Sequence, residues 1–275
     1  MVVTGATLTA VAVPYRPEAG TLVTAGLELT EARHVILQLH TDQGLTGLGE
    51  AVPRPSVYGE TLESITAAMR DLLLPPVLGL DPLDVEKVWA RWSRVVANTT
   101  AKAAIDMALH DVAGQMAQMP LYKMLGGWSD GRVHSVAVPL LLDESITTSA
   151  DVLWEIQLGN AGALSIRSPR SGFTATRKML GLAEAASVPC LVGSHRELGV
   201  GTAASAHLAA AYRCMRYPAE LGVHATLEDG LLEEPIQIVG GWLTTPTGPG
   251  LGVRLDAAKV AHYRIWSTSV GEIGA

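Results

Sequence analysis

The chain begins with strand-like segments in which apolar and polar residues alternate. Residues 3–13 and 34–40 have the composition of β-strands, and Asp42, Gln43 and Gly44 predict a turn before a further short strand. Segments joined by such a short turn pair antiparallel. The pattern therefore predicts an antiparallel sheet at the start of the chain.

Helical spacing of apolar residues follows these strands. Thr61 opens a first helix, with Ser64 three places on, and Asp81 and Pro82 provide an N-cap and a first helical residue for a second. A third helix is predicted over residues 99–118, where small residues dominate. Strands followed by helices are typical of an α+β domain, which we place at residues 1–130.

The rhythm of the chain changes after residue 130. Strand-like and helix-like stretches then alternate, with strands predicted over 133–142, 162–168 and 188–194 and helices over 150–158, 175–186 and 202–212. This alternation is typical of βαβ units and a parallel sheet. The predicted fold class is therefore α/β plus α+β, with a second unit, a partial barrel, at residues 131–250 and a C-terminal return over 251–275 that packs on the first.

Composition narrows the class of partner. The 275 residues are 48% hydrophobic, so the chain can bury a large core, and the net charge of −7 without a basic run argues against nucleic acid. No apolar run approaches bilayer length and the start lacks a secretory signal, so we expect a cytoplasmic protein with no membrane partner. Cys190 and Cys214 lack CxxC spacing and are expected to be buried free thiols. A small-molecule ligand is favoured.

Two parts of the sequence carry a family resemblance. The stretches GLGEAVPRPSVYGETLESI, LGLDPLDVEKVWARW and TTAKAAIDMALHDVAGQMAQMPLYKMLGG resemble the capping domain of the mandelate racemase and muconate lactonizing branch of the enolase superfamily. The stretches LLLDESITTSADVL, IRSPRSGFTATRKMLGLAEAASVPCLVGSHRELGVGTAASAHLAAA and PAELG resemble the later strands of its barrel, especially in muconate cycloisomerase-like members. The resemblance covers nearly the whole chain.

The resemblance implies a fold and a chemistry. It implies an enolase-type cap over a (β/α) barrel, where carboxylates at three successive strand ends hold Mg²⁺ and a base removes a proton next to a substrate carboxylate. By this resemblance Asp143, with Glu144 beside it, occupies the position of the third metal ligand. Glu197 occupies the position where the last strand contributes a carboxylate, and Arg167 the position of a catalytic lysine.

The resemblance also implies where substrate binds. The cap loops at 15–25 and 52–58 correspond to the loops that close over substrate, which makes Arg54 and Tyr58, together with Arg170, the candidate substrate-binding residues. His195 is the one imidazole beside a predicted strand end of the site, and its unperturbed pKa near 6.5 suits proton transfer. The candidate catalytic residues are therefore Arg167, His195 and Glu197.

The chain is too short for the complete barrel that the resemblance implies. A barrel takes about 250 residues and a βα unit about 30, so residues 132–251 have room for about four units. The stretch VHSVAVPLLLDES joins the approach to the first barrel strand directly to the fifth, and no KxK base motif occurs in the chain. The prediction is a truncated (β/α) barrel of about four βα units, in which two of the three Mg²⁺ ligand positions are missing.

Each candidate residue has an ordinary structural alternative. Asp143 could cap the following helix or pair with a cation, Glu197 could pair with Arg167 or His195, and Arg170 could be a surface cation. Arg167 stays protonated in proteins, so it cannot act as a general base, although it can clamp a carboxylate through two hydrogen bonds.

One further motif lies between the second and third strands of this alternation. The stretch SGFTATRK resembles an anion-binding loop before a helix, through Gly172 and Thr174.

These observations leave three hypotheses open. The first is an isomerase or cyclase acting on a small-molecule carboxylate, and the second is a non-catalytic descendant that binds a small acid or a protein partner. A third is a recent deletion whose product is marginally stable. A four-unit open sheet leaves unpaired edges and an apolar face, so we also expect a homo-oligomer, with a dimer as the simplest form.

Overall fold

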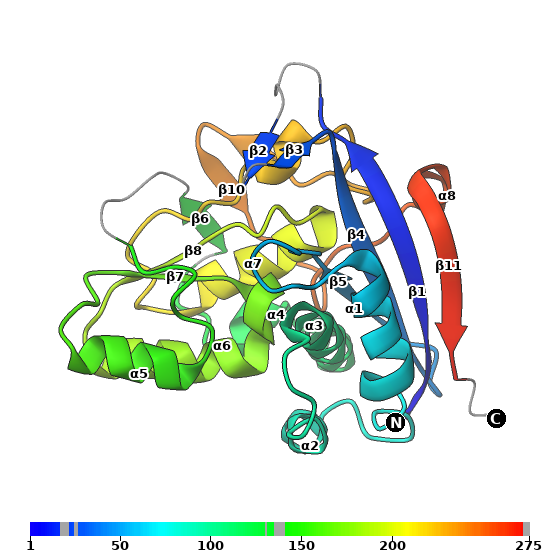
Figure 1. Ribbon diagram of the computed structural model, residues 1–275, viewed down its shortest axis with the longest axis horizontal. Coiled ribbons are helices and arrows are strands. Elements are labelled where there is room, and N and C mark those ends of the chain that lie inside the picture. The colour runs from blue at the N-terminus through cyan, green and yellow to red at the C-terminus, as the bar shows by residue number, and fades with distance from the viewer. Residues whose placement is uncertain (17–21, 25–26, 130, 135–140, 272–275) are drawn as a thin grey trace.

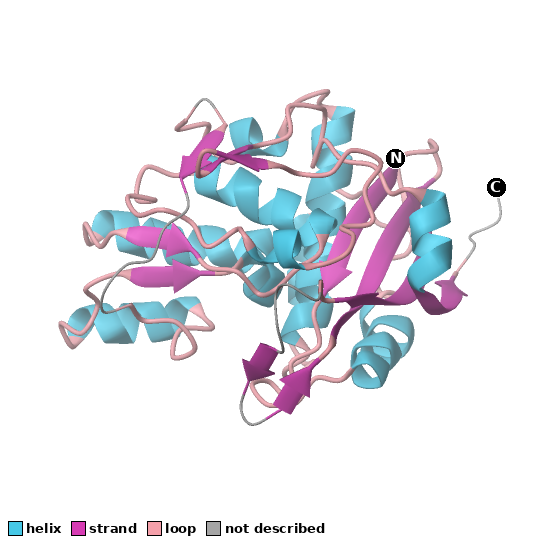
Figure 2. Cartoon of the chain, turned by 90° about the horizontal axis from the view of Figure 1, so that it is seen from above, coloured by secondary structure: helices cyan, strands magenta, loops and turns pink. Residues whose placement is uncertain are grey.

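The computed structural model describes residues 1–16, 22–24, 27–129, 131–134 and 141–271. An antiparallel sheet and a pair of parallel strands lie on opposite sides of the long helix α3 (Thr99–Met116), as Figures 1 and 2 show. Helix α3 packs against the sheet through β5 and against the other half through α6. It is therefore the structural link between the two halves.

The elements follow one another as strands, helices and then alternating strands and helices. The described strands are β1 (Val3–Pro14), β2 (Leu22–Thr24), β3 (Leu27–Leu29), β4 (Glu31–Thr41), β5 (Thr46–Ala51), β6 (Arg132–His134), β7 (Leu164–Ile166), β8 (Cys190–Val192), β9 (Ile238–Val239), β10 (Trp242–Thr244) and β11 (Arg264–Val270). The described helices are α1 (Leu62–Ala68), the π-helical turn η2 (Met69–Leu73), α2 (Val85–Arg91), α3, α4 (Leu121–Met124), α5 (Ser149–Gln157), α6 (Ser168–Ala185), α7 (Gly199–Ala211), the 3₁₀ turn η3 (Val223–Thr226) and α8 (Ala257–Tyr263). Among them, none combines the length and the apolar composition that crossing a bilayer requires.

The antiparallel start predicted from the sequence is confirmed. The sheet has the order β11-β1-β4-β5, and β4 and β5 are joined by the predicted turn, in which Gly44 has φ of +77°. The last described strand, β11, returns to pair antiparallel with β1. The first and last described strands therefore lie side by side in one sheet (Figure 1).

Capping chemistry sets where the cap helices begin. Thr61 and Ser64 form a reciprocal capping box, in which each side chain accepts a hydrogen bond from the other residue's backbone N–H, so this prediction is confirmed. The predicted start of the second helix is wrong by one turn. Asp81 instead accepts from the backbone N–H of Leu83 at 2.9 Å, so Pro82 lies in a turn, and α2 begins only after Asp84.

The predicted anion-binding loop binds a carboxylate of the protein itself. Asp106 on α3 is fully buried and accepts hydrogen bonds from the backbone N–H (3.1 Å) and the hydroxyl (2.6 Å) of Thr174 and from Nε1 of Trp89 (2.6 Å). Gly172, at φ of +73°, forms a non-helical kink inside α6 and lets the chain approach α3, because a Cβ there would lie 2.9 Å from Asp106 Oδ2. The motif therefore joins the two halves and is not a ligand site.

The second half contains a short run of parallel strands. Strand β7 pairs parallel with β8, and parallel bridges add Leu142 beside β7 and Met215 beside β8. Helices α5, α6 and α7 connect these segments, so the described residues place four chain segments in one parallel run. The strand predicted over 133–142 is wrong in part, since β6 pairs antiparallel with β10 in another sheet, and residues 135–140 lie outside the described residues.

A buried carboxylate on α3 makes the stability of the fold depend on pH. Asp111 accepts from the backbone N–H groups of Leu48 (2.8 Å) and Leu251 (2.6 Å), and burial raises its pKa to about 6. A folded-state pKa above the unfolded value means that this group's stabilisation is present below about pH 4 and is lost as the pH rises through about 6.

We therefore expect the free energy of unfolding of the wild type to fall, relative to that of Asp111→Asn, by about 3 kcal/mol between pH 4 and pH 7.5. Urea unfolding of both proteins across this range measures the difference, and titration of the other groups cancels between them. A difference that is flat or rises with pH would contradict the role assigned to Asp111.

Candidate active site

Asp143 is held by two arginines at the end of the parallel run. It follows Leu142, forms an ion pair with Arg167 at the end of β7, and accepts from Nη1 of Arg170 both at Oδ1 (3.1 Å) and at its backbone oxygen (3.0 Å). Arg170 is only 1% exposed, so the alternative of a surface cation is wrong. Of the two structural alternatives for Asp143, a helix cap or an ion pair with a cation, the structure shows the ion pair.

Burial and charge act in opposite directions on this carboxylate. Burial raises the pKa of Asp143, and the charges of Arg167 and Arg170 oppose that rise. Glu144, beside it, lies 4.0 Å from Arg167 with a side chain 60% exposed. Asp143 is therefore the enclosed member of the pair, and Glu144 faces solvent.

Gly193 makes room for the arginine at this strand end. A Cβ on Gly193 would lie 2.9 Å from Nε of Arg167 and 2.3 Å from the hydroxyl oxygen of Ser165. Such contacts are too short for a real side chain. The glycine after β8 is therefore what allows the Arg167 side chain to lie across the strand ends.

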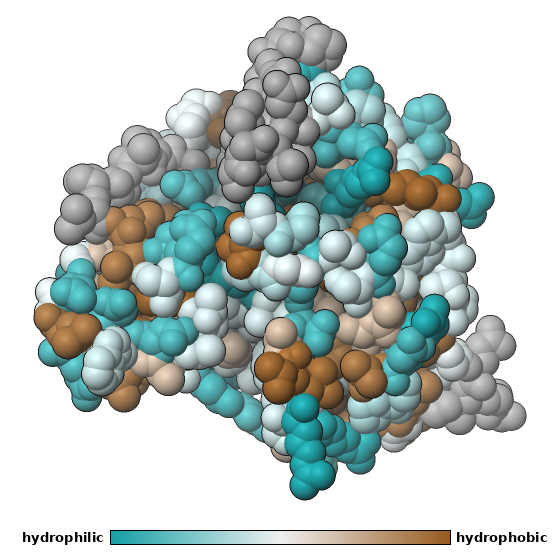
Figure 3. Space-filling model, in the orientation of Figure 1, coloured by the Kyte–Doolittle hydropathy of each residue, from teal (hydrophilic) through white to brown (hydrophobic). Residues whose placement is uncertain are grey.

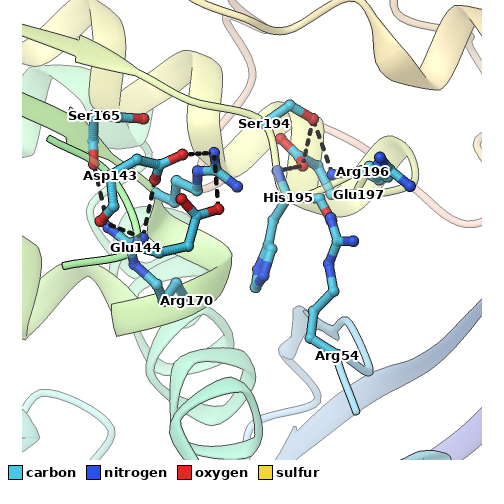
Figure 4. A network of polar contacts seen from close by, with 10 residues as sticks. Arg54, Asp143, Glu144, Ser165, Arg170, Ser194, His195, Arg196 and Glu197 are labelled. Carbon is cyan, nitrogen blue, oxygen red and sulfur yellow. Dashed lines mark hydrogen bonds and ion pairs between the residues drawn. The ribbon is translucent and has the colours of Figure 1, made fainter. Parts of the chain in front are cut away.

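A second buried carboxylate follows β8. Glu197 is 1% exposed, and its Oε2 accepts from the backbone N–H of His195 (2.6 Å) and from the hydroxyl of Ser194 (3.1 Å), as Figure 4 shows. The alternative of a salt bridge to Arg167 or to the His195 ring is not what the described contacts show. Burial raises the pKa of Glu197, and the neighbouring charge of Glu50 adds to the rise.

The cap loop predicted to cover the site contacts His195. The ring of Tyr58 packs edge-on against the His195 ring at 5.4 Å, and Nη2 of Arg54 donates to the backbone oxygen of His195 at 3.3 Å. Burial, followed by the positive charges of Arg54 and Arg167, lowers the pKa of His195 well below 6.5. The imidazole is therefore neutral at physiological pH. Residues 17–21 and 25–26 of the other predicted loop lie outside the described residues.

The sequence did not reveal the group that fixes the cap on this site. Glu50, at the end of β5, is fully buried, lies 2.7 Å from Nδ1 of His34 and accepts from the backbone N–H groups of Leu198 (2.5 Å) and Gly201 (2.8 Å). A carboxylate in the apolar context GLGEA was the available signal. Arg196 was missed too, and nothing in its sequence context distinguishes it from a surface cation.

Unpartnered polar atoms gather at this site. Among the residues that the structure describes, nine buried side-chain nitrogen or oxygen atoms have no hydrogen-bond partner, and seven of them are here. They belong to Arg54, Ser165, Arg167, Arg170, His195, Arg196 and Glu197. Buried polar atoms are normally satisfied, so these atoms are the ones available to a polar ligand or to ordered water.

The described residues do not fit the Mg²⁺ ion that the resemblance implies. Both oxygens of Asp143 already contact guanidinium groups, whose charge would repel a cation at the same position. Mg²⁺ favours several oxygen ligands in octahedral geometry, and no group of three or more His, Cys, Asp or Glu side chains in the described part of the chain could hold a metal. The site is cationic in character.

Two family models match the chain. The model for the mandelate racemase / muconate lactonizing enzyme N-terminal domain matches residues 4–126, and the enolase C-terminal domain-like model matches residues 119–259. Together they cover the cap and the parallel-strand half.

Curated proteins and solved structures agree with these models. Chloromuconate cycloisomerase from Cupriavidus pinatubonensis is 24% identical, over 83% of this chain and 90% of that protein, and muconate cycloisomerase 1 from Rhodococcus opacus is 24% identical, over 86% and 92%. The crystal structure of a muconate lactonizing enzyme from Mycobacterium smegmatis complexed with muconolactone superposes with a TM-score of 0.90 at 27% identity, covering 97% of this chain and 100% of that one. The alignments with the two curated cycloisomerases span 336 and 344 residues, more than the 275 of this chain. These relatives therefore have segments without a counterpart here.

Proposed function

Since the chain belongs to the mandelate racemase and muconate lactonizing enzyme family of the enolase superfamily, with its N-terminal capping domain and C-terminal barrel domain, we propose that it is a muconate cycloisomerase-like isomerase or cyclase acting on a small carboxylate. One observation carries the proposal: a neutral histidine and a buried carboxylate lie two residues apart in the segment after β8, close to arginines with unpartnered N–H groups. Acid–base groups beside cations suit proton transfer next to a carboxylate.

In this proposal His195 and Glu197 move the proton. The unpartnered Nδ1 of His195 accepts a proton from the carbon next to the substrate carboxylate, and the electron pair left behind moves into that carboxylate as an enolate. Glu197, whose pKa burial raises, is assigned the return of a proton from its unpartnered Oε1 at the end of the reaction. Two groups whose pKa values are displaced in opposite directions by their surroundings are what an acid–base pair requires.

The arginines stabilise negative charge in this proposal. Arg54 and Arg167 both depress the pKa of His195, so a bound carboxylate that offsets their charge would make the imidazole a stronger base. Tyr58 contacts the His195 ring and closes the cap side of the site. Arg170 donates to Asp143 and to the backbone oxygen of Ser165, so we assign it to positioning rather than to contact with substrate.

The proposal also includes the truncated barrel. Alignments longer than the chain and a parallel run of four segments in the described residues support the absence of early barrel strands. In this proposal the missing strands are the ones that carry the family's KxK base and two of its three metal ligands, so those groups are absent too. The proposed chemistry therefore relies on His195 and the arginines in place of those groups.

Turnover of a substrate panel tests the proposed function. Muconates, hydroxy acids and N-acyl amino acids are incubated with the purified chain, with Mg²⁺ and with EDTA, and products are separated by chromatography. The proposal expects turnover of at least one carboxylate in EDTA. Binding without turnover of any member would instead support the alternative, a non-catalytic descendant that binds a small acid, which the low basicity of His195 favours.

We also propose that the chain self-associates. Leu153, Trp154 and Leu158 on and next to α5 are 43%, 62% and 55% exposed, and Figure 3 shows apolar surface at the end of the molecule where α5 lies. Exposed apolar side chains of this size are typical of contacts between chains. Sedimentation velocity at micromolar concentration is expected to show a dimer or larger species, and a compact monomer would contradict this.

A further inference from the structure

We propose that Arg54 and Arg196 form an anion-binding seat for a carboxylate or a comparable oxyanion in the cleft between the cap and the loop after β8. This cleft has a volume of about 400 Å³ and is lined by both arginines together with Tyr15, Arg33 and His34. The seat extends the proposed function and rests on it only for the identity of the anion as a substrate carboxylate.

Two arginines of the cleft lack a paired carboxylate. Among the described residues, the arginines paired with a carboxylate are Arg33, Arg70, Arg167, Arg170 and Arg254. Arg54 and Arg196 have no such pair, and Nε of Arg54 and Nη1 of Arg196 are buried without a hydrogen-bond partner. Partly buried charges of one sign are costly unless an opposite charge joins them.

The two carboxylates that line the cleft are not paired with Arg54 or Arg196: Glu31 forms an ion pair with Arg33 at 2.6 Å, and Glu63 is exposed and forms no ion pair among the described residues. Burial raises the pKa of Tyr15, so its phenol stays neutral and can serve as a hydrogen-bond donor. Burial and then the charges of Arg196 and Arg167 lower the pKa of Arg54, which shows that the guanidinium groups act on one another. An anion between Arg54 and Arg196 would relieve this repulsion and complete their hydrogen bonds.

The backbone holds Arg196 in position for this role. Arg196 has φ of +61°, a conformation that non-glycine residues rarely adopt, and its N–H donates to the hydroxyl of Ser194 at 2.9 Å. His195 and Glu197 on either side are buried, and Figure 4 shows Arg196 extending away from Asp143. The strained residue therefore directs its side chain to the opposite side from the Asp143 pair, consistent with a separate anion seat.

The other arginines near the cleft and the site are already paired with carboxylates of the protein. Arg33 lines the same cleft but forms an ion pair with Glu31 at 2.6 Å, and Arg167 and Arg170 are paired with Asp143. An incoming anion would compete with an internal carboxylate at each of these arginines. Only Arg54 and Arg196, among the described arginines around the cleft and the site, offer charge without such competition.

Calorimetric titration of succinate and of inorganic phosphate into the full chain, in low-salt buffer at pH 7.5, tests the seat. We expect both anions to bind, and Arg196→Gln and Arg54→Gln each to weaken binding about 10-fold or more, since a charge-assisted hydrogen bond is lost. Arg33→Gln is the matched control, because it removes the same charge from the same cleft, and it should change the Kd by less than about twofold. Equal weakening by Arg33→Gln, or unchanged binding in Arg196→Gln, would overturn the proposal.

Three further measurements keep the test decisive. Should Arg54→Gln fail to fold by circular dichroism, Arg196→Gln decides the outcome, because Arg196 makes no described contact with the cap sheet's backbone. Inhibition of turnover by phosphate would identify the seat with the substrate carboxylate, whereas phosphate binding without inhibition would assign it to a separate anion. Succinate binding without any turnover removes the proposed reaction and leaves the seat, and turnover without succinate or phosphate binding removes the seat.

Discussion

Asp143→Ala is expected to destabilise the protein by about 3–5 kcal/mol, because it leaves Arg170 buried without its carboxylate. Arg170 is 1% exposed and Arg167 has a side chain only 12% exposed, so neither guanidinium can turn to water without moving the strand ends. Urea unfolding followed by circular dichroism measures the loss.

Two variants separate this charge effect from simple truncation. Glu144→Ala is the matched control, since Glu144 is adjacent but 60% exposed, and it should change stability by no more than about 0.5 kcal/mol. Arg170→Met in the Asp143→Ala background should recover part of the loss, because it removes the uncompensated charge. Equal effects of Asp143→Ala and Glu144→Ala would show that the pair does not hold the strand ends together.

His195→Gln is expected to lower kcat for the panel substrate that turns over by about 10²–10⁴-fold, the usual contribution of a positioned general base. The surroundings also fix the pH dependence. Because burial and the arginines lower the pKa of His195 well below 6.5, the imidazole of the free protein stays neutral, and kcat/KM should not fall between pH 8 and pH 6.5.

The control for this prediction is His262→Gln, on the exposed side of α8, which should leave kcat unchanged. Thermal unfolding checks that His195→Gln remains folded. A variant that keeps near-normal kcat, or a wild-type kcat/KM that falls as the pH drops towards 6.5, would remove His195 from the role of base.

Local patterns explain what the sequence predicted well. The antiparallel start depends on a short turn, and the helix at Thr61 depends on a capping box. Both involve residues only a few positions apart, so both can be predicted without knowledge of the fold. The expectation that Cys190 and Cys214 are buried free thiols, which rested on local context and the absence of CxxC spacing, is confirmed. Features of this kind depend on residues that are close together in the sequence.

Long-range contacts explain what the sequence missed. Strand β6 pairs with β10, about a hundred residues later, and nothing near β6 indicates that partner. The loop at Thr174 resembled an anion site because it is one, but its anion is Asp106 from α3. The resemblance put Asp143 and Arg167 at the ends of successive strands, whereas their pairing, and that of Asp143 with Arg170, depends on distances that only the folded chain defines.

Arginines, rather than a metal ion, are proposed to bind the carboxylate of a small acid at this site. Calorimetric titration of cis,cis-muconate into the purified chain in excess EDTA, repeated with Mg²⁺ in place of EDTA, distinguishes the two. We expect saturable binding in EDTA with a Kd that Mg²⁺ does not improve. Binding that appears only with Mg²⁺, and is lost in Asp143→Ala protein shown to be folded, would contradict it.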